Sequence, residues 1–320
     1  MSTHSFNHLA IIGIGLLGAS IAHAVKAYGG AQTVSLWDVS EDVRARASGI
    51  FPGQVADHVE AAVADADCVI LCTPVGALQE VTKALATSLS EGAILTDVGS
   101  VKAKAAADMA VHCPRHVHLI PGHPIAGTEQ SGPEAGFASL FQEAWHILTP
   151  GPDESLEYKA AIAQLTAFWV GLGARVETMD PKRHDRVLAI TSHLPHLIAY
   201  NIVATAYDME SVEQGEVVKY SAGGFRDFTR IAASDPTMWR DVFLTNKDAV
   251  LETLGRFSED LAALQRAIRW GDGDTLMKEF SRARGIRKAI IDAGLDTAEA
   301  DFGRRQTAST SDGGTDDVPD

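Results

Sequence analysis

The sequence predicts a doubly wound α/β domain at the N-terminus, followed by an all-helical second domain. Over residues 1–179, short β-branched runs alternate with helical stretches, which is typical of a parallel sheet covered on both faces. Over residues 180–302 the strand signal almost disappears, and alanine- and leucine-rich windows carry charges at helical spacing. We expect residues 303–320 to form a disordered tail, because they lack apolar periodicity.

The individual elements follow from these patterns. The expected strands of the first domain are residues 9–14, 33–37, 68–72, 93–96, 118–121, 146–149 and 174–177. Helices are expected between them at residues 19–27, 78–89 and 155–172. The clearest helical windows of the second domain are residues 187–206, 238–256 and 259–270.

Composition narrows the class of partner. A formal net charge of −15 argues against nucleic acid and against an acidic membrane surface. We find no apolar run of about 18 residues that could cross a bilayer, and no signal peptide, so we expect a cytoplasmic protein. Cys68 and Cys72 share one predicted strand, too far apart for a disulfide, and reduced thiols are expected. An anionic substrate would need a local cluster of positive charge.

A glycine-rich loop follows the first predicted strand and precedes a helix. Gly13, Gly15 and Gly18, with Leu16 and Leu17 between the last two, give the pattern G-x-G-x-x-G. The first glycine permits a tight turn, the second lets backbone approach a pyrophosphate, and the third permits close helix packing. The helix N-terminus then offers free N–H groups to the phosphates. This context predicts a Rossmann-type dinucleotide site.

An acidic residue indicates which dinucleotide binds. Asp38 lies twenty residues after Gly18, at the end of the second predicted strand, where its carboxylate can accept from ribose hydroxyls. The same carboxylate repels the extra phosphate of NADP, so we expect NAD. Thr73 and Pro74 follow the strand at residues 68–72, and we expect this turn to line the cofactor crevice.

Polar segments follow two further strands and recur in the helical domain. Ser100 lies in the segment 97–102, and His123 lies in the segment 122–129. The helical domain carries the strings TSHLPH and GFRDFTRIA. With GHPIAGTE, and in this order behind the glycine loop, these strings resemble the prephenate/arogenate dehydrogenase family, the cyclohexadienyl dehydrogenases of the tyrosine pathway. The resemblance covers roughly residues 9–295.

The resemblance implies roles for matching positions. His123 contacts the ring hydroxyl of the substrate, with Ser100 beside it. Ser192 and His196 lie near the substrate side chain, and Arg230 binds a carboxylate. Further positions of the pocket are Thr128, Glu129, Gln130, Asp227 and Trp239, with Glu129 pairing with the arginine to gate entry. The helical domain is the family's dimerisation region, which implies a homodimer with site groups from both subunits.

The implied reaction explains these residue types. The substrate, a dicarboxylate, loses hydride from C4 and CO2 from C1 and becomes aromatic. Hydride departure leaves positive character on the C4 oxygen, and a neutral imidazole that accepts from this hydroxyl stabilises it. Arg226 and Arg230 stand four apart on a predicted helix, and guanidinium groups bind carboxylates bidentately.

Several alternatives remain. A β-hydroxyacid dehydrogenase shares the domain plan but uses a helical-domain lysine, where this chain has residues 193–196. A non-catalytic NAD sensor would leave His123 and Arg230 without a reason to converge. No metal is expected, because Cys113 and the nearby histidines match no common zinc spacing. Gln130, which is neutral, favours prephenate over arogenate without excluding dual use.

Overall fold

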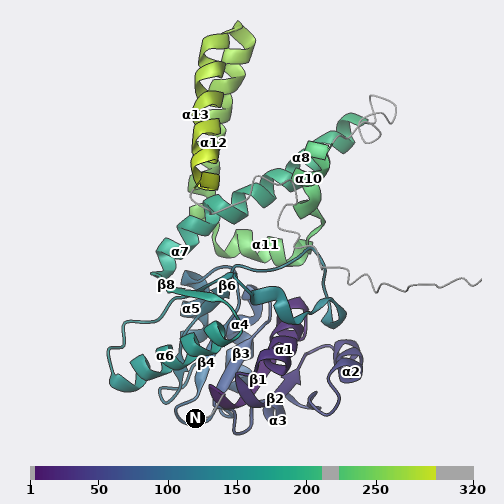
Figure 1. Ribbon diagram of the computed structural model, residues 1–320, viewed down its shortest axis with the longest axis vertical. Coiled ribbons are helices and arrows are strands. Elements are labelled where there is room, and N and C mark those ends of the chain that lie inside the picture. Colours follow the sequence, from purple (N-terminus) through teal and green to yellow (C-terminus); the bar gives the residue numbers. More distant parts are fainter. Residues whose placement is uncertain (1–3, 211–222, 293–320) are drawn as a thin grey trace, which may run out of the picture. The chain divides into compact units, whose positions relative to one another are not determined.

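The computed structural model describes residues 4–210 and 223–292 (Figure 1). The predicted tail, residues 303–320, lies outside the described residues. The chain divides into two compact units, Met1–Arg256 and Phe257–Asp320. The predicted boundary between residues 179 and 180 stays a prediction, because both sides of it fall within the first unit.

The first unit contains a parallel sheet of five strands in the order β2-β1-β3-β4-β5, within the residues described. The strands are β1 (Phe6–Ile12), β2 (Ala31–Trp37), β3 (Cys68–Leu71), β4 (Ile94–Asp97) and β5 (His118–Leu119). The chain order reverses between β1 and β3, so the carboxyl ends of these two strands flank the crevice where such sheets bind ligands.

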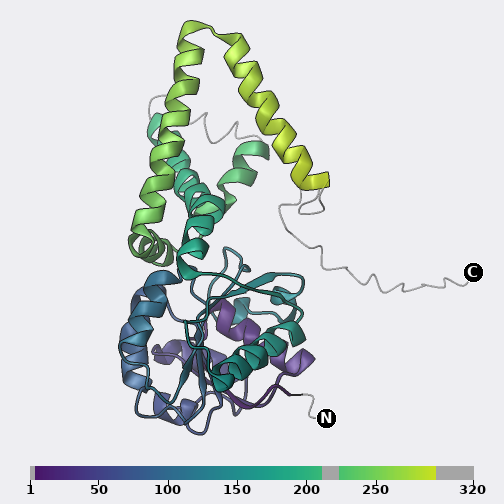
Figure 2. The same cartoon turned by 90° about the vertical axis from the view of Figure 1, so that its left-hand side faces the viewer.

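Helices cover both faces of this sheet (Figure 2). The helices are α1 (Leu16–Tyr28), α2 (Glu41–Ile50), α3 (Val59–Val63), α4 (Leu78–Leu85), α5 (Ala103–Ala110) and α6 (Leu156–Gly171). Leu9 and Ile11 of β1 point into the core shared with α1 and α6, whereas Ala10 and Ile12 point into the core shared with α3, α4 and α5. This alternation confirms the doubly wound prediction.

The later strands form a second sheet, which the sequence did not predict. It joins β6 (Gly122–Pro124), β7 (Trp145–Leu148) and β8 (Arg175–Thr178) in that order. β6 runs antiparallel to β7, with His123 opposite Ile147, and β7 runs parallel to β8. The three residues of β6 include a proline, so they carry no strand periodicity, and the sequence indicated only a polar segment there.

The remainder of the described chain is helical, as predicted. Its helices are α7 (Pro181–Leu188), α8 (Leu194–Glu210), α10 (Gly223–Thr229), α11 (Pro236–Thr245), α12 (Lys247–Trp270) and α13 (Gly273–Asp292). Asp180 caps α7 by accepting from the backbone N–H of Arg183 at 2.9 Å. A π-helical turn, Ala189–His193, joins α7 to α8 without a break.

The helix Pro181–Met209 is long and apolar enough, by length and composition alone, to cross a membrane. The expectation that no stretch reaches this length is therefore wrong. Only 28% of its most apolar window is buried. Val187, Ile190 and Tyr207 are among its exposed apolar side chains, so this helix carries apolar surface that the described residues leave uncovered.

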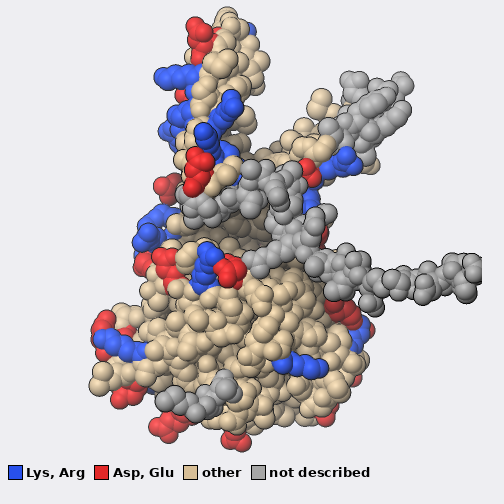
Figure 3. Space-filling view, in the orientation of Figure 1, with Lys and Arg blue, Asp and Glu red and all other residues tan. Residues whose placement is uncertain are grey.

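In the view of Figure 3, the lysines and arginines of the rounded body lie apart from one another. Some of them pair locally with acids, as Arg46 of α2 does with both Asp42 and Glu134. The body therefore presents no broad basic patch in this view, whereas several lysines and arginines lie along α12 and α13.

Candidate active site

The glycine loop has the shape that a dinucleotide requires. Gly13 has a φ of +101°, and a Cβ there would lie 2.6 Å from the carbonyl oxygen of Cys72. A Cβ at Gly18 would lie 1.9 Å from the carbonyl oxygen of Gly13, so neither position admits a side chain. By contrast, a Cβ at Gly15 would meet no described atom within 4 Å. The loop is therefore tight against the protein at two glycines and open at the third.

The N-terminus of α1 faces this open space without a side-chain cap. Gly15 is the capping residue, and no side chain bonds to the first turn of the helix. Leu16 is buried and Leu17 packs against the core, so only their backbone N–H groups remain to serve a ligand. Unpaired N–H groups at a helix start favour an anion such as a pyrophosphate.

Asp38 lies directly after β2 and beside the glycine loop. Its Oδ2 accepts from the backbone N–H of Ile14 at 2.8 Å, and its Oδ1 accepts from that of Ser40 at 2.9 Å. Each carboxylate oxygen can accept a further bond. Asp38 therefore fixes the loop while keeping acceptor capacity for ribose hydroxyls.

Thr73 and Pro74 follow β3, next to the glycine loop in the sheet order. The Thr73 hydroxyl oxygen is buried and has no hydrogen-bond partner among the described residues. Pro74 is exposed and precedes a short 3-10 turn. The Thr73 hydroxyl is thus a polar group that still lacks the partner a bound ligand would provide.

His123 lies in β6 at the start of a buried hydrogen-bonded chain. Its Nδ1 lies 2.9 Å from Nε2 of His184, and Nδ1 of His184 lies 2.8 Å from Oδ1 of Asp185. Asp185 in turn accepts from the backbone N–H of Lys102 at 2.7 Å and of Ala103 at 2.9 Å. Residues about sixty positions apart in the sequence therefore meet at one imidazole.

A buried ion pair lies next to the backbone that precedes this histidine. The Nζ of Lys102 donates to Oδ2 of Asp97 at 2.5 Å and to the carbonyl oxygen of Gly122 at 2.6 Å, and both charged side chains are fully buried. The pair ties the end of β4 to β6. Ser100 lies half-buried in the turn between Asp97 and Lys102.

The surroundings of His123 oppose its protonation. Burial is the main cause that lowers its pKa well below 6.5, and electrostatic interactions with His184, Lys102, His146 and His193 lower it further. The His123 imidazole is therefore uncharged at neutral pH, as the proposed acceptor role requires.

A second group of aromatic and histidine side chains lies in the helical part. His196 stacks on Trp239 with ring centroids 3.8 Å apart, and His193 meets the same indole at 6.0 Å. Nδ1 of His196 donates to the carbonyl oxygen of Ser192 at 2.8 Å, which leaves Nε2 as its free ring nitrogen. Burial is the largest cause that lowers the pKa of His196. The hydrogen bond to Ser192 raises this pKa to a smaller extent, and the charge of Arg230 lowers it further.

Arg230 pairs with Glu129, as the resemblance implied. The Nη1 of Arg230 lies 3.0 Å from Oε2 of Glu129, and each side chain is about one third exposed. The Arg230 Nε is buried without a partner among the described residues, as is the Trp239 Nε1. Arg226, predicted on the same helix face, is exposed.

Three further predicted pocket residues are exposed or only half-buried. Thr128 and Gln130 are exposed on the loop that carries Glu129, where the Thr128 hydroxyl accepts from the backbone N–H of Gln130 at 3.2 Å. Asp227 is half-buried in α10. Their roles toward a substrate stay predictions.

Sequence reasoning missed part of the His123 chain. The family strings do not include His184 or Asp185, and no sequence pattern indicated that Asp97 pairs with Lys102. The His-Asp pair at residues 184 and 185, just inside a helix that begins at Pro181, was the available signal. Nothing local indicated that Asp185 bonds to the start of α5.

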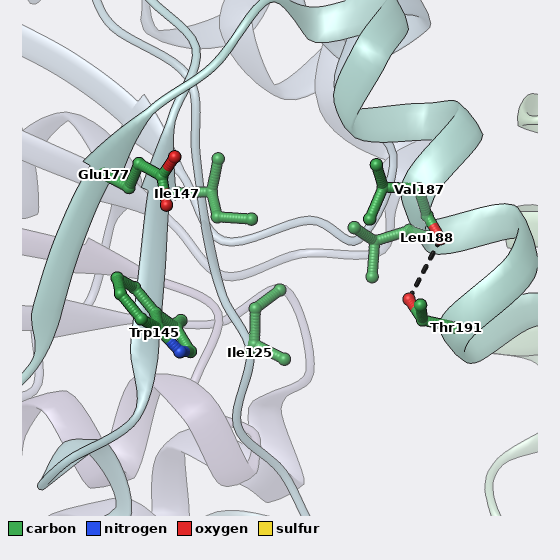
Figure 4. Close-up of a pocket in the computed structure, with 7 residues that line it drawn as sticks. All are labelled: Ile125, Trp145, Ile147, Glu177, Val187, Leu188 and Thr191. Carbon is green, nitrogen blue, oxygen red and sulfur yellow. Dashed lines mark hydrogen bonds between the residues drawn. The ribbon is translucent and has the colours of Figure 1, made fainter. Parts of the chain in front are cut away.

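An apolar hollow of about 220 Å³ lies between the second sheet and α7 (Figure 4). Its lining residues are Ile125, Trp145, Ile147, Glu177, Val187, Leu188 and Thr191. The one charged residue of this lining is acidic, so the lining offers no positively charged group to a carboxylate. It contains none of the predicted site residues.

Comparisons with known proteins cover both parts of the chain. The family model of the prephenate dehydrogenase nucleotide-binding domain matches residues 21–178, and that of the prephenate dehydrogenase dimerization domain matches residues 180–282. A cyclohexadienyl dehydrogenase of Zymomonas mobilis is 44% identical over 286 residues, which are 89% of this chain and 96% of that protein. A prephenate dehydrogenase of Bacillus subtilis is 33% identical over 88% of this chain and 76% of its own length.

Solved structures agree with this match. The prephenate dehydrogenase from Aquifex aeolicus, in complex with hydroxyphenyl propionate and NAD+, superposes with a TM-score of 0.82 at 33% identity. The superposition covers 90% of this chain and all of the other chain. The glycine loop at residues 13–18 precedes the matched range of the nucleotide-binding model, so its geometry is an independent observation.

Proposed function

Because this chain belongs to the prephenate dehydrogenase family, we propose that it uses NAD to oxidise and decarboxylate prephenate, arogenate or both, on the route to tyrosine. The observation that carries the proposal is the buried, uncharged imidazole of His123. It lies in the same compact unit as the glycine loop and the Arg230–Glu129 pair.

The residues present fit NAD. Gly15 leaves space beside the uncapped start of α1, Asp38 keeps acceptor capacity, and the Thr73 hydroxyl has no partner in the described chain. When bound, NAD accepts the hydride that leaves the substrate ring. The chain therefore has only to hold the ring, accept a proton and neutralise carboxylates.

His123 accepts the proton of the ring hydroxyl. Loss of hydride from C4 leaves positive character on the attached oxygen, and the uncharged imidazole stabilises it by accepting the hydroxyl hydrogen. A positioned group of this kind contributes about 10²–10⁴ in rate. Ser100, in the turn next to the Lys102–Asp97 pair, is proposed to lie beside the same hydroxyl.

Arg230 binds a carboxylate of the substrate. In the described chain its guanidinium is engaged by Glu129, and its Nε lacks a partner. A substrate carboxylate competes with Glu129 for this guanidinium and can form two parallel bonds with it. His196 and Ser192 are proposed to contact the substrate side chain, with Trp239 packing behind His196.

The functional molecule is proposed to be a homodimer. The match to a dimerization domain assigns the helical part to self-association. The uncovered apolar face of the helix Pro181–Met209 supports this, because a subunit interface would remove its exposed side chains from water. A contribution of the second subunit to each site, and the cytoplasmic location, stay predictions.

The test is an assay of NADH absorbance with each substrate, crossed with NAD and NADP. We expect turnover with NAD. The variant His123→Asn is expected to lose about 10²–10⁴ in kcat with little change in KM. His58→Asn, at an exposed histidine, is the matched control. Turnover of His123→Asn at the native rate would contradict the mechanism, and NAD binding without turnover of either substrate would favour a sensor.

A further inference from the structure

We propose that His184 and Asp185 form a positioning relay that keeps His123 in the tautomer able to accept a proton from the substrate. This inference rests on the proposed function, because it concerns the same imidazole. Neither residue is proposed to touch the substrate; each acts through His123.

The relay begins at a carboxylate that acts only as an acceptor. Asp185 belongs to α7, and its buried side chain lies against the start of α5. Its Oδ1 accepts from the backbone N–H of Lys102, and its Oδ2 accepts from that of Ala103. Because two backbone N–H groups point at this side chain, it presents lone pairs on both oxygens. Its contact with His184 Nδ1 at 2.8 Å therefore requires a hydrogen on that nitrogen.

The next two nitrogens follow from this hydrogen. A neutral His184 that is protonated on Nδ1 has a lone pair on Nε2. Nε2 lies 2.9 Å from Nδ1 of His123, so Nδ1 of His123 must be the donor of that bond. Nε2 of His123 then carries the lone pair, and it is the ring nitrogen left to meet a substrate hydroxyl. Without the relay, both tautomers of His123 would be populated, and one of them would present N–H to that hydroxyl.

The surroundings of His123 otherwise oppose a positive charge on its ring. The charged or titratable groups that face His123 are His184 from α7, Lys102 from the turn before α5, His146 from β7 and His193 from the π-helical turn. Each of these opposes a cation, and the carboxylate of Asp97 is occupied by Lys102. The carboxylate that the hydrogen-bonded chain joins to His123 is that of Asp185, through the ring of His184.

The proton balance of the step is closed. As hydride leaves C4, the O–H bond of the ring hydroxyl breaks, its electron pair stays on oxygen, and the proton bonds to Nε2 of His123. Loss of CO2 from C1 then moves the C1–carboxylate electron pair into the ring, which becomes a phenolate. The phenolate takes the proton back from Nε2, so His123 ends the cycle neutral in its starting tautomer.

The first test reads the tautomer without any turnover. Nitrogen NMR of the full-length, histidine-labelled chain saturated with NAD distinguishes protonated from unprotonated ring nitrogens. The His123 signals are assigned by their loss in His123→Asn. We expect His123 protonated on Nδ1 and unprotonated on Nε2 near neutral pH. A hydrogen on Nε2 of His123, or on both nitrogens of His184, would overturn the relay even if the enzyme is active.

The second test removes the negative charge. Asp185→Asn is expected to lower kcat about 10²-fold, while KM for prephenate stays within about threefold. The matched control is Asp180→Asn, which alters another carboxylate of the same helix that also accepts a backbone N–H. An unchanged kcat in Asp185→Asn, or equal losses in both variants, would show that the carboxylate is only structural.

A third comparison uses His184 itself. The amide oxygen of His184→Gln can still accept from Nδ1 of His123, whereas His184→Leu offers no acceptor. We expect the kcat of His184→Gln to be at least about tenfold higher than the kcat of His184→Leu. Equal rates would contradict the relay. If the native chain turned over neither substrate, the proposed function would fail, but the NMR result would still decide the tautomer.

Discussion

Buried histidines around the candidate site make stability depend on pH. Burial is the largest cause in each case, and it lowers the pKa of His123 and His146 well below 6.5 and that of His193 to about 4. The unfolded chain binds protons at these positions from about pH 6.5 downward, whereas the folded chain does not. The stability that depends on keeping these histidines uncharged is therefore complete above about pH 6.5. It is lost as the pH falls toward their pKa values in the folded chain.

The magnitude follows from linkage. Each such group adds up to about 1.4 kcal/mol per pH unit to the slope of the unfolding free energy. Where all three histidines stay uncharged in the folded chain, their slopes add to about 4 kcal/mol per pH unit. Since a domain has about 5–15 kcal/mol of net stability, we expect a large part of it to be lost within about two units below pH 6.5.

His146 allows this reasoning to be tested at a histidine with no proposed contact to the substrate. Its ring is fully buried and stacks on Trp169 at 3.9 Å, and neither ring nitrogen has a partner within the described chain. We expect His146→Leu to reduce the slope below about pH 6 by about 1.4 kcal/mol per unit. His58→Leu, at an exposed histidine, is the control and should leave the slope unchanged.

The measurement is urea unfolding, followed by tryptophan fluorescence, at about pH 7, 6, 5.5 and 5. It compares the unfolding free energies of the native chain and the two variants. A free energy that stays flat from about pH 7 to 5, or a slope in His146→Leu equal to that of the control, would refute the reasoning.

Three further predictions concern charged groups of the site. Arg230→Ala is expected to raise KM for prephenate about 10- to 100-fold, because it removes a charged hydrogen-bond donor and leaves Glu129 facing the substrate; steady-state kinetics should show a much smaller change in kcat. Asp38→Ser is expected to reduce the preference for NAD over NADP at least about tenfold in kcat/KM, and an unchanged ratio would remove Asp38 from cofactor selection. Lys102→Met is expected to destabilise the fold by about 3–5 kcal/mol in urea unfolding, because the charge of Asp97 is left buried and unpaired. Adding Asp97→Asn to the same chain should recover a substantial part of the lost free energy of unfolding.

The parts of the fold that depend on local pattern were predictable from the sequence. The runs at residues 33–37 and 68–72 became β2 and β3, because a buried strand needs a short apolar, β-branched segment. The glycine loop was predictable because Gly13 and Gly18 meet backbone atoms that leave no room for a Cβ. The family strings predicted a role for His123, which stays a prediction, and the pairing of Arg230 with Glu129, which the structure contains.

The parts that depend on contacts between distant residues were not predictable. Whether a short strand joins the first sheet or a second one depends on its neighbours, and β6 has only three residues. The bond from Lys102 to Asp185 joins positions 83 residues apart, and no periodicity in either segment encodes it. The apolar length of the helix Pro181–Met209 was missed because the sequence was searched for an uninterrupted apolar run.

The π-helical turn Ala189–His193 sets the rotation of the pair His184 and Asp185 relative to the pair His193 and His196. Successive residues of an α-helix are rotated by about 100°, so one extra residue in a turn reorients everything beyond it. His184 and Asp185 precede this turn, whereas His193 and His196 lie at its end and beyond it. Deleting one residue within 189–193 would rotate one pair against the other by about a quarter of a circle. We therefore expect the insertion or deletion of a single residue to be poorly tolerated within residues 189–193.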